Sequence, residues 1–415
     1  MGIARRVYLY GIALIALGML VAGLSGLLET ALTALVEYLV PLPPSLGEPQ
    51  LRSRISLSGA LAAIGLIAWL IHWGLADRAV RRGGEGGAVE RRSGIRKLFL
   101  YAALFAGGLL LTFALAGLIR DLLLATFGRL TGADLLTGSI TEPVARIAVV
   151  GAFWVYYTRV ARSDRAIQPE VGAGATLRRW CVYALSLTGL LLALFSATGL
   201  IRLIWETVVP VPGATALTPD GVGIEVAGRT GSLVAGLILW AGHWRWATAW
   251  FQQTGGADPE ARSVLRKVYL YLVLAVAVGW TVWNLGGILN RLLRMALISD
   301  PVATGWAGVL HEAGAAIAPA LVFGVGWLYH ARVVGREAAL AGERHRQATI
   351  RWTYLYLVAL IGLVTFAVGL AGVASTLVDL AAQPGALRPT HWWEDRISLF
   401  GTLALVGLPL WAFHW

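Results

Sequence analysis

Residues 6–26 read RVYLYGIALIALGMLVAGLSG, an arginine and two tyrosines followed by an apolar run that ends in a serine and a glycine. Tyr10 and Gly26 are sixteen residues apart. The same spacing, with a small residue before each glycine, recurs at Tyr101/Gly117, Tyr183/Gly199, Tyr271/Gly287 and Tyr356/Gly372. These tyrosines follow one another at intervals of 82 to 91 residues. A fixed period of this kind predicts a repeated architecture.

A second signature, Trp-x-x-His, closes the repeated segments. It occurs at Trp69/His72, Trp240/His243, Trp327/His330 and Trp411/His414. In the second segment Trp154 is kept, but Tyr157 stands at the histidine position. Together the two signatures predict five tandem units of two helices each, over residues 1–77, 92–162, 176–250, 263–333 and 349–415.

The composition is that of an integral membrane protein. Hydrophobic residues make up 57% of the chain and charged residues 14%, against roughly 25% charged residues in soluble domains. A transmembrane helix needs roughly 20 mostly apolar residues, and each unit offers two such stretches. The sequence therefore predicts an all-α membrane protein of about ten transmembrane helices, arranged as five tandem hairpins of the same topology. Residues 143–160 form the weakest of these expected spans.

The charges are distributed unevenly along the chain. The N-terminal segment and the loops between units carry 23 of the 34 lysines and arginines but only 9 acids, whereas the loops inside units carry 11 basic and 14 acidic residues. Because basic loops stay on the cytoplasmic side, we expect both termini in the cytoplasm and the chain in a bacterial cytoplasmic (inner) membrane. The net charge of +11 thus reflects topology, and we expect a lipid bilayer and no nucleic acid as partner.

Three local features carry further expectations. The glycine-rich stretch Arg81–Gly87 is typical of a flexible linker. The small residue and glycine of each Tyr–Gly pair favour close packing of helices. The chain stops at Trp415, where earlier units continue into basic loops, so we expect that the natural protein extends further.

The units resemble an uncharacterised prokaryotic family, a domain of unknown function described as an integral membrane helical pair. The residues that carry the resemblance are Arg6–Tyr10, Lys97–Tyr101, Lys267–Tyr271 and Trp352–Tyr356, together with the Trp-x-x-His ends. The third unit departs from this pattern, with Trp180-Cys181-Val182-Tyr183. The resemblance implies fold and location, and it brings no activity with it.

The repeated histidines are the candidate binding residues. We expect His72, His243, His330 and His414 in the last cytoplasmic turn of a second helix, where a cation suits the helix dipole and a tryptophan suits the membrane interface. Anchoring and capping is the favoured interpretation. The alternative is that these histidines ligate haem or bacteriochlorophyll. No metal site is expected.

The expected apolar cores hold no charged residue at mid-depth, although ion-coupled transporters usually keep one there. We find no catalytic motif and expect no enzyme. The leading hypothesis is a scaffold or accessory subunit of a membrane complex, which would bind a membrane-protein partner or form a homo-oligomer. The alternatives are a channel or transporter for an uncharged or lipidic substrate, and a redox or photosynthetic subunit that uses the histidines.

Overall fold

The computed structural model describes residues 2–40, 45, 47–82, 84–130, 132–209, 218–253, 263–298, 306–341, 345–382 and 389–415. Within these ranges the regular structure is helical, and ten segments are long and apolar enough to cross a membrane. The predictions of an all-α membrane protein and of ten spans are confirmed. The segment over residues 132–167 has the lowest mean hydropathy of the ten, which agrees with the expectation of a weak span at 143–160.

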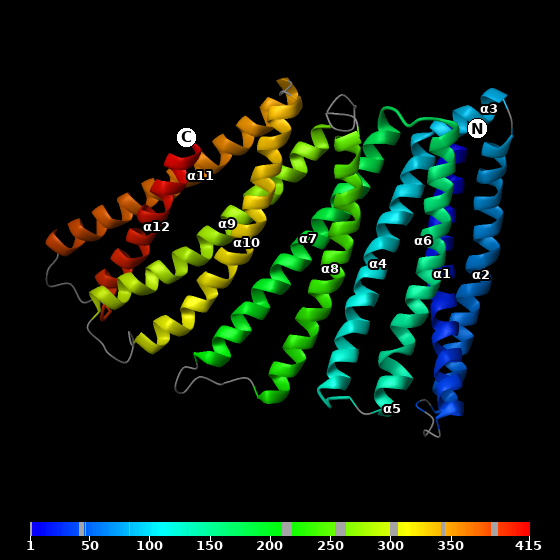
Figure 1. Ribbon diagram of the computed structural model, residues 1–415, viewed down its shortest axis with the longest axis horizontal. Helices are drawn as coiled ribbons and strands as arrows, with labels where there is room; N and C mark the ends of the chain where they lie inside the picture. Colours follow the sequence, from blue (N-terminus) through cyan, green and yellow to red (C-terminus); the bar gives the residue numbers. More distant parts are fainter. Residues whose placement is uncertain are drawn as a thin grey trace. The chain divides into compact units, whose positions relative to one another are not determined.

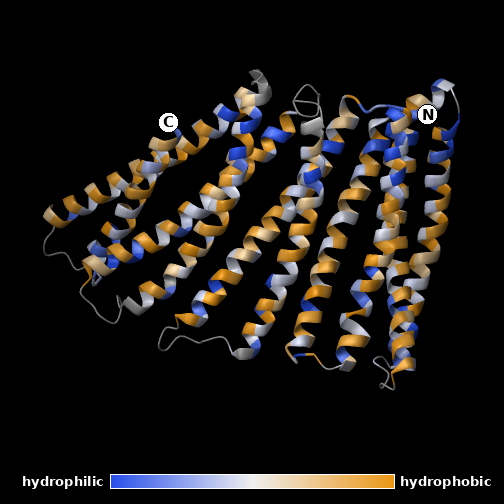
Figure 2. Cartoon of the chain, in the orientation of Figure 1, coloured by the Kyte–Doolittle hydropathy of each residue, from blue (hydrophilic) through white to orange (hydrophobic). Residues whose placement is uncertain are grey.

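The long helices extend well beyond the apolar stretches. They are α1 (Ile3–Leu39), α2 (Glu48–Arg81), α4 (Gly94–Thr126), α6 (Thr141–Ile167), α7 (Ala173–Val208), α8 (Pro219–Gln253), α9 (Val264–Leu297), α10 (Trp306–Ala341), α11 (His345–Ala382) and α12 (Trp392–His414). Three short elements complete the described part: α3 (Gly84–Arg92), α5 (Gly132–Asp134) and the π-helix η1 (Leu135–Ser139). Helix α1 has 37 residues and is about 55 Å long at 1.5 Å per residue. It therefore exceeds a hydrocarbon core of roughly 30 Å, and hydrophilic residues gather at its N-terminal end (Figures 1 and 2).

The chain divides into two compact units, each described here by itself. The first contains Met1–Ala193 and Pro219–Ala247, and the second contains Leu194–Thr218 and Thr248–Trp415. Helices α1, α2, α4 and α6 pack together in the first unit, with α8 and the first part of α7 (Figure 1). In the second unit, α9 packs on α10, α11 and α12.

Three helix pairs, α1–α2, α7–α8 and α11–α12, are held by contacts of a glycine with the partner backbone. Each glycine lies four residues before the tryptophan of the Trp-x-x-His signature. A Cβ at Gly65 would lie 2.5 Å from the backbone nitrogen of Leu20, and one at Gly236 would lie 2.9 Å from that of Ala193. Gly407 meets the backbone of Phe366 in the same way. Only glycine lets the two backbones approach this closely.

The pairs α4–α6 and α9–α10 have a large residue at the equivalent position. Val150 replaces the glycine in α6, and Phe323 replaces it in α10. Both side chains are buried. The Phe323 ring packs against Phe195, with 5.2 Å between the ring centroids, within the second unit. These two pairs therefore need another means of attachment, which lies at their polar ends.

The glycines of the Tyr–Gly signature differ from one another. A Cβ at Gly26 would meet Ser58, and one at Gly372 would meet the Phe400 ring, so both contribute to packing as expected. At Gly117 and Gly287 a Cβ would meet only open space. The expectation of close packing is wrong at these two glycines, because no atom of a neighbouring element lies within 4 Å of the place where their Cβ would stand.

The stretch that was expected to be a flexible linker is partly helical. Helix α2 continues to Arg81, and α3 begins at Gly84, which has a φ of +77°. Gly87 lies against the carbonyl oxygens of Val80 and Arg82, where a Cβ would not fit. The turn therefore needs glycine at both positions, and it places Glu90 of α3 beside the other helices.

Candidate functional site

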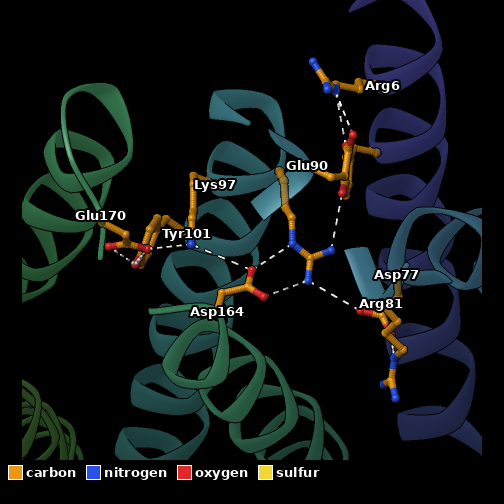
Figure 3. Close-up of polar contacts among 10 residues, drawn as sticks. Arg6, Asp77, Arg81, Glu90, Lys97, Tyr101, Asp164 and Glu170 are labelled. Atoms are coloured by element: carbon orange, nitrogen blue, oxygen red, sulfur yellow. Dashed lines mark hydrogen bonds and ion pairs between the residues drawn. The ribbon is translucent and has the colours of Figure 1, made fainter. Parts of the chain in front are cut away.

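A network of buried ions joins the basic ends of helices in the first unit (Figure 3). At its centre is Arg96, near the beginning of α4, with 1% of its surface exposed. Its Nε donates to Oδ2 of Asp164 in α6 over 2.8 Å, and Nη2 lies 3.4 Å from Oδ1 of the same carboxylate. Nη2 also lies 3.4 Å from Oδ1 of Asp77 in α2, and Nη1 lies 3.3 Å from the Tyr10 hydroxyl of α1. One guanidinium thus links four helices.

The neighbouring Lys97 extends the network toward α7. Its Nζ lies 2.8 Å from Glu170 and 3.7 Å from Asp164. Glu170 also accepts a hydrogen bond of 2.8 Å from the Tyr101 hydroxyl and pairs with Arg178 over 3.3 Å. Buried charges are tolerated in proteins when they are paired and hydrogen-bonded. Each of these ions lies within 4 Å of an opposite charge.

The second unit repeats this arrangement in α9 and α10. Arg266 and Lys267 are 1% and 4% exposed, and both bind the Glu337 carboxylate. The distances are 2.8 Å from Arg266 Nε and 3.2 Å from Lys267 Nζ. We call an Arg-Lys dipeptide bound to a carboxylate of the paired helix an ion clamp. Ion clamps occur in α4–α6 and α9–α10, the two pairs that lack the close glycine contact.

Helix α3 adds one more ion pair to the network. Arg6 of α1 donates through Nε to both oxygens of Glu90, over 3.2 and 3.0 Å. The Glu90 side chain is almost fully buried. The short helix that follows the turn at Gly84 and Gly87 therefore ties the beginning of α1 to the loop before α4.

Three of the four candidate histidines share one geometry. In each, Nδ1 lies 2.8 or 2.9 Å from the carbonyl oxygen four residues earlier in its own helix. Because a carbonyl oxygen only accepts, Nδ1 carries the proton and Nε2 is left with its lone pair. That Nε2 lies 3.4 or 3.5 Å from a tyrosine hydroxyl of the paired helix. The pairs are His72/Tyr8, His330/Tyr269 and His414/Tyr354.

The other two helix pairs differ from this pattern: one changes both members of the pair, and one changes only the tyrosine. In α4–α6, Phe99 replaces the tyrosine and Tyr157 replaces the histidine, and the two rings pack edge to face at 5.4 Å. The Tyr157 hydroxyl accepts instead from Nε1 of Trp69 in α2 over 2.7 Å. In α7–α8 the tyrosine position is Cys181, while the histidine, His243, remains.

His243 therefore stands apart from the other three histidines. Its Nδ1 lies 2.9 Å from the Leu239 carbonyl oxygen, and within the described residues no hydrogen bond to Nε2 is found. Its imidazole lines a cavity of about 360 Å³ with residues of α4, α6, α7 and α8. A second cavity, of about 820 Å³, lies among α1, α4 and α6 and is lined mainly by Leu, Val, Ala and Gly.

The expected place of the histidines in a last helical turn is wrong for three of them. Helix α2 continues nine residues beyond His72, α8 ten beyond His243, and α10 eleven beyond His330. Only His414 ends its helix. C-terminal capping is thus excluded for the first three, whose Nδ1 atoms bond inside the helix. Whether the histidines ligate haem or bacteriochlorophyll stays a prediction.

Sequence reasoning missed the ion clamps. It used Lys97 and Lys267 only as part of the repeated signature and gave Asp164 and Glu337 no role. A signal was present, because Asp164 and Glu337 both lie ten residues after the signature tryptophan, at Trp154 and Trp327. In the other three helix pairs, the glycine four residues before the tryptophan was also a signal in the sequence, and it was not used to predict a close contact.

Residues 6–152, 179–310 and 353–415 match the family model described as Domain of unknown function (DUF5671). The chain belongs to the DUF5671 family. The three matched segments begin at Arg6, Arg179 and Thr353, each three or four residues before the signature tyrosine of a pair with a glycine contact. No curated protein and no solved structure matches the chain. Membership of DUF5671 supplies no activity, so function rests on the site.

Proposed function

We propose that this DUF5671 protein is a non-enzymatic scaffold or accessory subunit of a bacterial inner-membrane complex. The observation that carries the proposal is the use of the buried charges. Arg96 and Lys97 both bind the carboxylate of Asp164. In the second unit, Arg266 and Lys267 both bind the carboxylate of Glu337. Such charges tie helices together and are not presented to a substrate.

The proposed scaffold presents apolar helix faces to its surroundings. In α11, Leu360, Ile361 and Val364 are more than half exposed. A transmembrane helix of a partner, or of a second copy, would pack there through van der Waals contacts. Lipid covers such a face equally well, so partner capture has to be tested directly.

We also propose that the fold consists of five hairpins of the same topology, with both termini in the cytoplasm. The recurrence of the Tyr–His pair in α1–α2, α9–α10 and α11–α12 supports equivalent hairpins. The glycine contacts and ion clamps divide them into two alternating kinds. The three family matches, which begin at the first, third and fifth hairpins, are consistent with this alternation.

Purification from native membranes in a mild detergent tests the scaffold role. Mass spectrometry should find one membrane protein, or a second copy of this chain, in a constant ratio. Substitution of Leu360 and Val364 by tryptophan should lower that ratio without loss of the folded chain. A protein that purifies as a monomer at all detergent concentrations would contradict the proposal.

A second candidate function is transport of an uncharged or lipidic substrate. The cavity of about 820 Å³ among α1, α4 and α6 favours it, because its walls are mostly apolar. Its few charged lining residues, Glu29, Glu142 and Arg146, belong to one end of the helices. Release of a fluorescent lipid from proteoliposomes, compared with a variant that fills the cavity (Ala106→Trp), would test this function.

One observation favours the hypothesis that the histidines ligate haem or bacteriochlorophyll. His243 lines a cavity, and within the described residues its Nε2 forms no hydrogen bond. An absorption spectrum of protein purified from its native membrane tests it. Haem or bacteriochlorophyll should give a visible band that is lost in His243→Leu and kept in His72→Leu. A spectrum without such a band would refute this role.

A further inference from the structure

The cavity beside His243 combines cationic groups with an apolar wall. It lies within the first unit, among α4, α6, α7 and α8, and has a volume of about 360 Å³. This volume is within the range of roughly 300–1,000 Å³ that is usual for small-molecule sites. The charged ends of these helices carry the basic residues that the positive-inside rule assigns to the cytoplasmic side. The cavity is therefore at the level of lipid headgroups.

Two arginines on one face of α6 form the cationic side of the cavity. Arg162 is exposed and Arg165 is half-buried, and both line the cavity. The Arg165 guanidinium lies over the Trp246 ring, 5.6 Å from its centroid. Among the described residues neither arginine forms an ion pair, in contrast to Arg96 and Lys97 in the adjacent network. Two guanidinium groups without a carboxylate favour a phosphate.

Two further polar atoms lack a partner within the described residues. The Oγ1 atom of Thr158 is buried and forms no hydrogen bond. It lies on α6, one turn before Arg162, and lines the same cavity. The second atom is Nε2 of His243, which accepts hydrogen bonds because Nδ1 donates to the Leu239 carbonyl. Buried polar atoms without a partner are rare in native structures, so Oγ1 of Thr158 calls for a ligand or a water molecule.

The replacement of tyrosine by Cys181 explains why Nε2 of His243 has no tyrosine hydroxyl beside it. In three other helix pairs a tyrosine hydroxyl lies beside Nε2 of the equivalent histidine. At Cys181 no side-chain hydroxyl is available, and the cysteine lines the cavity instead. The side chains of Val182, Leu104 and Leu185 form an apolar wall. This wall suits the part of an acyl chain that is nearest to a headgroup.

We propose that this cavity binds an anionic phospholipid whose head carries a phosphodiester and free hydroxyl groups. Arg162 and Arg165 bind the phosphate, and a headgroup hydroxyl donates to Nε2 of His243. Thr158 donates to a phosphate oxygen. Basic pockets between transmembrane helices on the cytoplasmic side are known to bind acidic headgroups. The site goes beyond the scaffold role and does not depend on it.

Native mass spectrometry of the full chain tests the proposal. The protein is exchanged into mixed micelles that contain equal amounts of phosphatidylglycerol and phosphatidylcholine. The wild type should retain one phosphatidylglycerol in clear preference to phosphatidylcholine. The double variant Arg162→Gln/Arg165→Gln should weaken that retention by about tenfold or more, because both phosphate-binding charges are removed. The variant His243→Leu should weaken it severalfold.

Matched controls separate a built site from general attraction to anionic lipid. Arg159→Gln removes an exposed charge from the same helix, outside the cavity, and should leave retention unchanged. His72→Leu changes a histidine of the first hairpin and should also have no effect. Equal retention of the two lipids, or an equal loss in Arg159→Gln and in the double variant, would overturn the proposal. Binding of glycerol phosphate that displaces the lipid completely would assign the site to a free phosphate ester, and would overturn the lipid as ligand.

Discussion

The guanidinium of Arg96 and the carboxylate of Asp164 are joined by a hydrogen bond of 2.8 Å, and both side chains are almost completely buried. They come from the first and second helices of one pair, 68 residues apart. The pair α9–α10 is joined in the same way by Arg266 and Glu337. The attachment of these two helix pairs therefore depends on charge at their ends, whereas the other three pairs depend on glycine within the bilayer.

The first prediction concerns the ion clamp of α4–α6. Asp164→Ala leaves the guanidinium of Arg96 and the ammonium of Lys97 without their shared carboxylate. Loss of one partner of a buried ion pair costs roughly 3–5 kcal/mol, so the variant should unfold at a clearly lower temperature in detergent. The exposed pair Glu48/Arg52 supplies the control. Glu48→Ala should leave the unfolding temperature nearly unchanged, and equal effects of the two substitutions would contradict the assignment.

The second prediction concerns the glycine contact between α1 and α2. In Gly65→Ala the new Cβ would lie 2.5 Å from the backbone nitrogen of Leu20, so α1 and α2 must move apart. Overpacking of this kind typically costs about 1–3 kcal/mol. Gly74→Ala on the same helix meets nothing within 4 Å and should be neutral or slightly stabilising. The free energy of unfolding in mixed micelles measures both effects. A neutral Gly65→Ala would disprove the close contact.

The third prediction concerns the contribution of the Tyr–His pairs to stability. The Tyr269 hydroxyl lies 3.4 Å from Nε2 of the fully buried His330. A double-mutant cycle with Tyr269→Phe and His330→Leu should give a coupling energy of about 0.5–1.5 kcal/mol. The equivalent cycle with Tyr354→Phe and His414→Leu should give a coupling of the same sign. Zero coupling in both cycles would show that the recurrent geometry contributes nothing to stability.

The fourth prediction concerns topology. Cys181 is the only cysteine and is buried, so Cys181→Ala provides a background without thiols. In that background Ser45→Cys should react with a membrane-impermeant maleimide in intact cells. Arg82→Cys should react only after permeabilisation. The reverse pattern would place the termini outside, against the positive-inside rule.

Much of the fold was predictable from hydropathy and charge. The ten spans follow from length and composition, because the bilayer imposes both. The residues at which the helices end could not be predicted from length and composition. Segments such as Arg159–Ile167 resemble polar loops, yet they continue α6, because arginine and alanine are good helix formers when no glycine or proline interrupts them. The histidines were therefore placed too close to the ends of their helices.

The candidate site was less predictable for a different reason. Asp164 and Arg96 are distant in sequence, and Glu90 lies in a stretch that resembles a linker. Single-sequence patterns report local periodicity, whereas these contacts depend on how separate helices meet. The missing tyrosine partner of His243 likewise depends on Cys181, a residue of another helix that lies near His243 only because α7 packs on α8.

The separation of Arg96 from Asp164 has a consequence for biosynthesis. A ribosome releases α4 with its Arg-Lys dipeptide well before it has made the carboxylate that binds them. Until α6 is inserted, these two cations remain at the aqueous surface, because burial without a partner is too costly. The glycine contact of α1 and α2 needs no such partner and forms as soon as both helices are inserted. We therefore expect the nascent chain to assemble in alternating steps, in which the pairs α4–α6 and α9–α10 stay open at their charged ends until Asp164 and Glu337 have been translated.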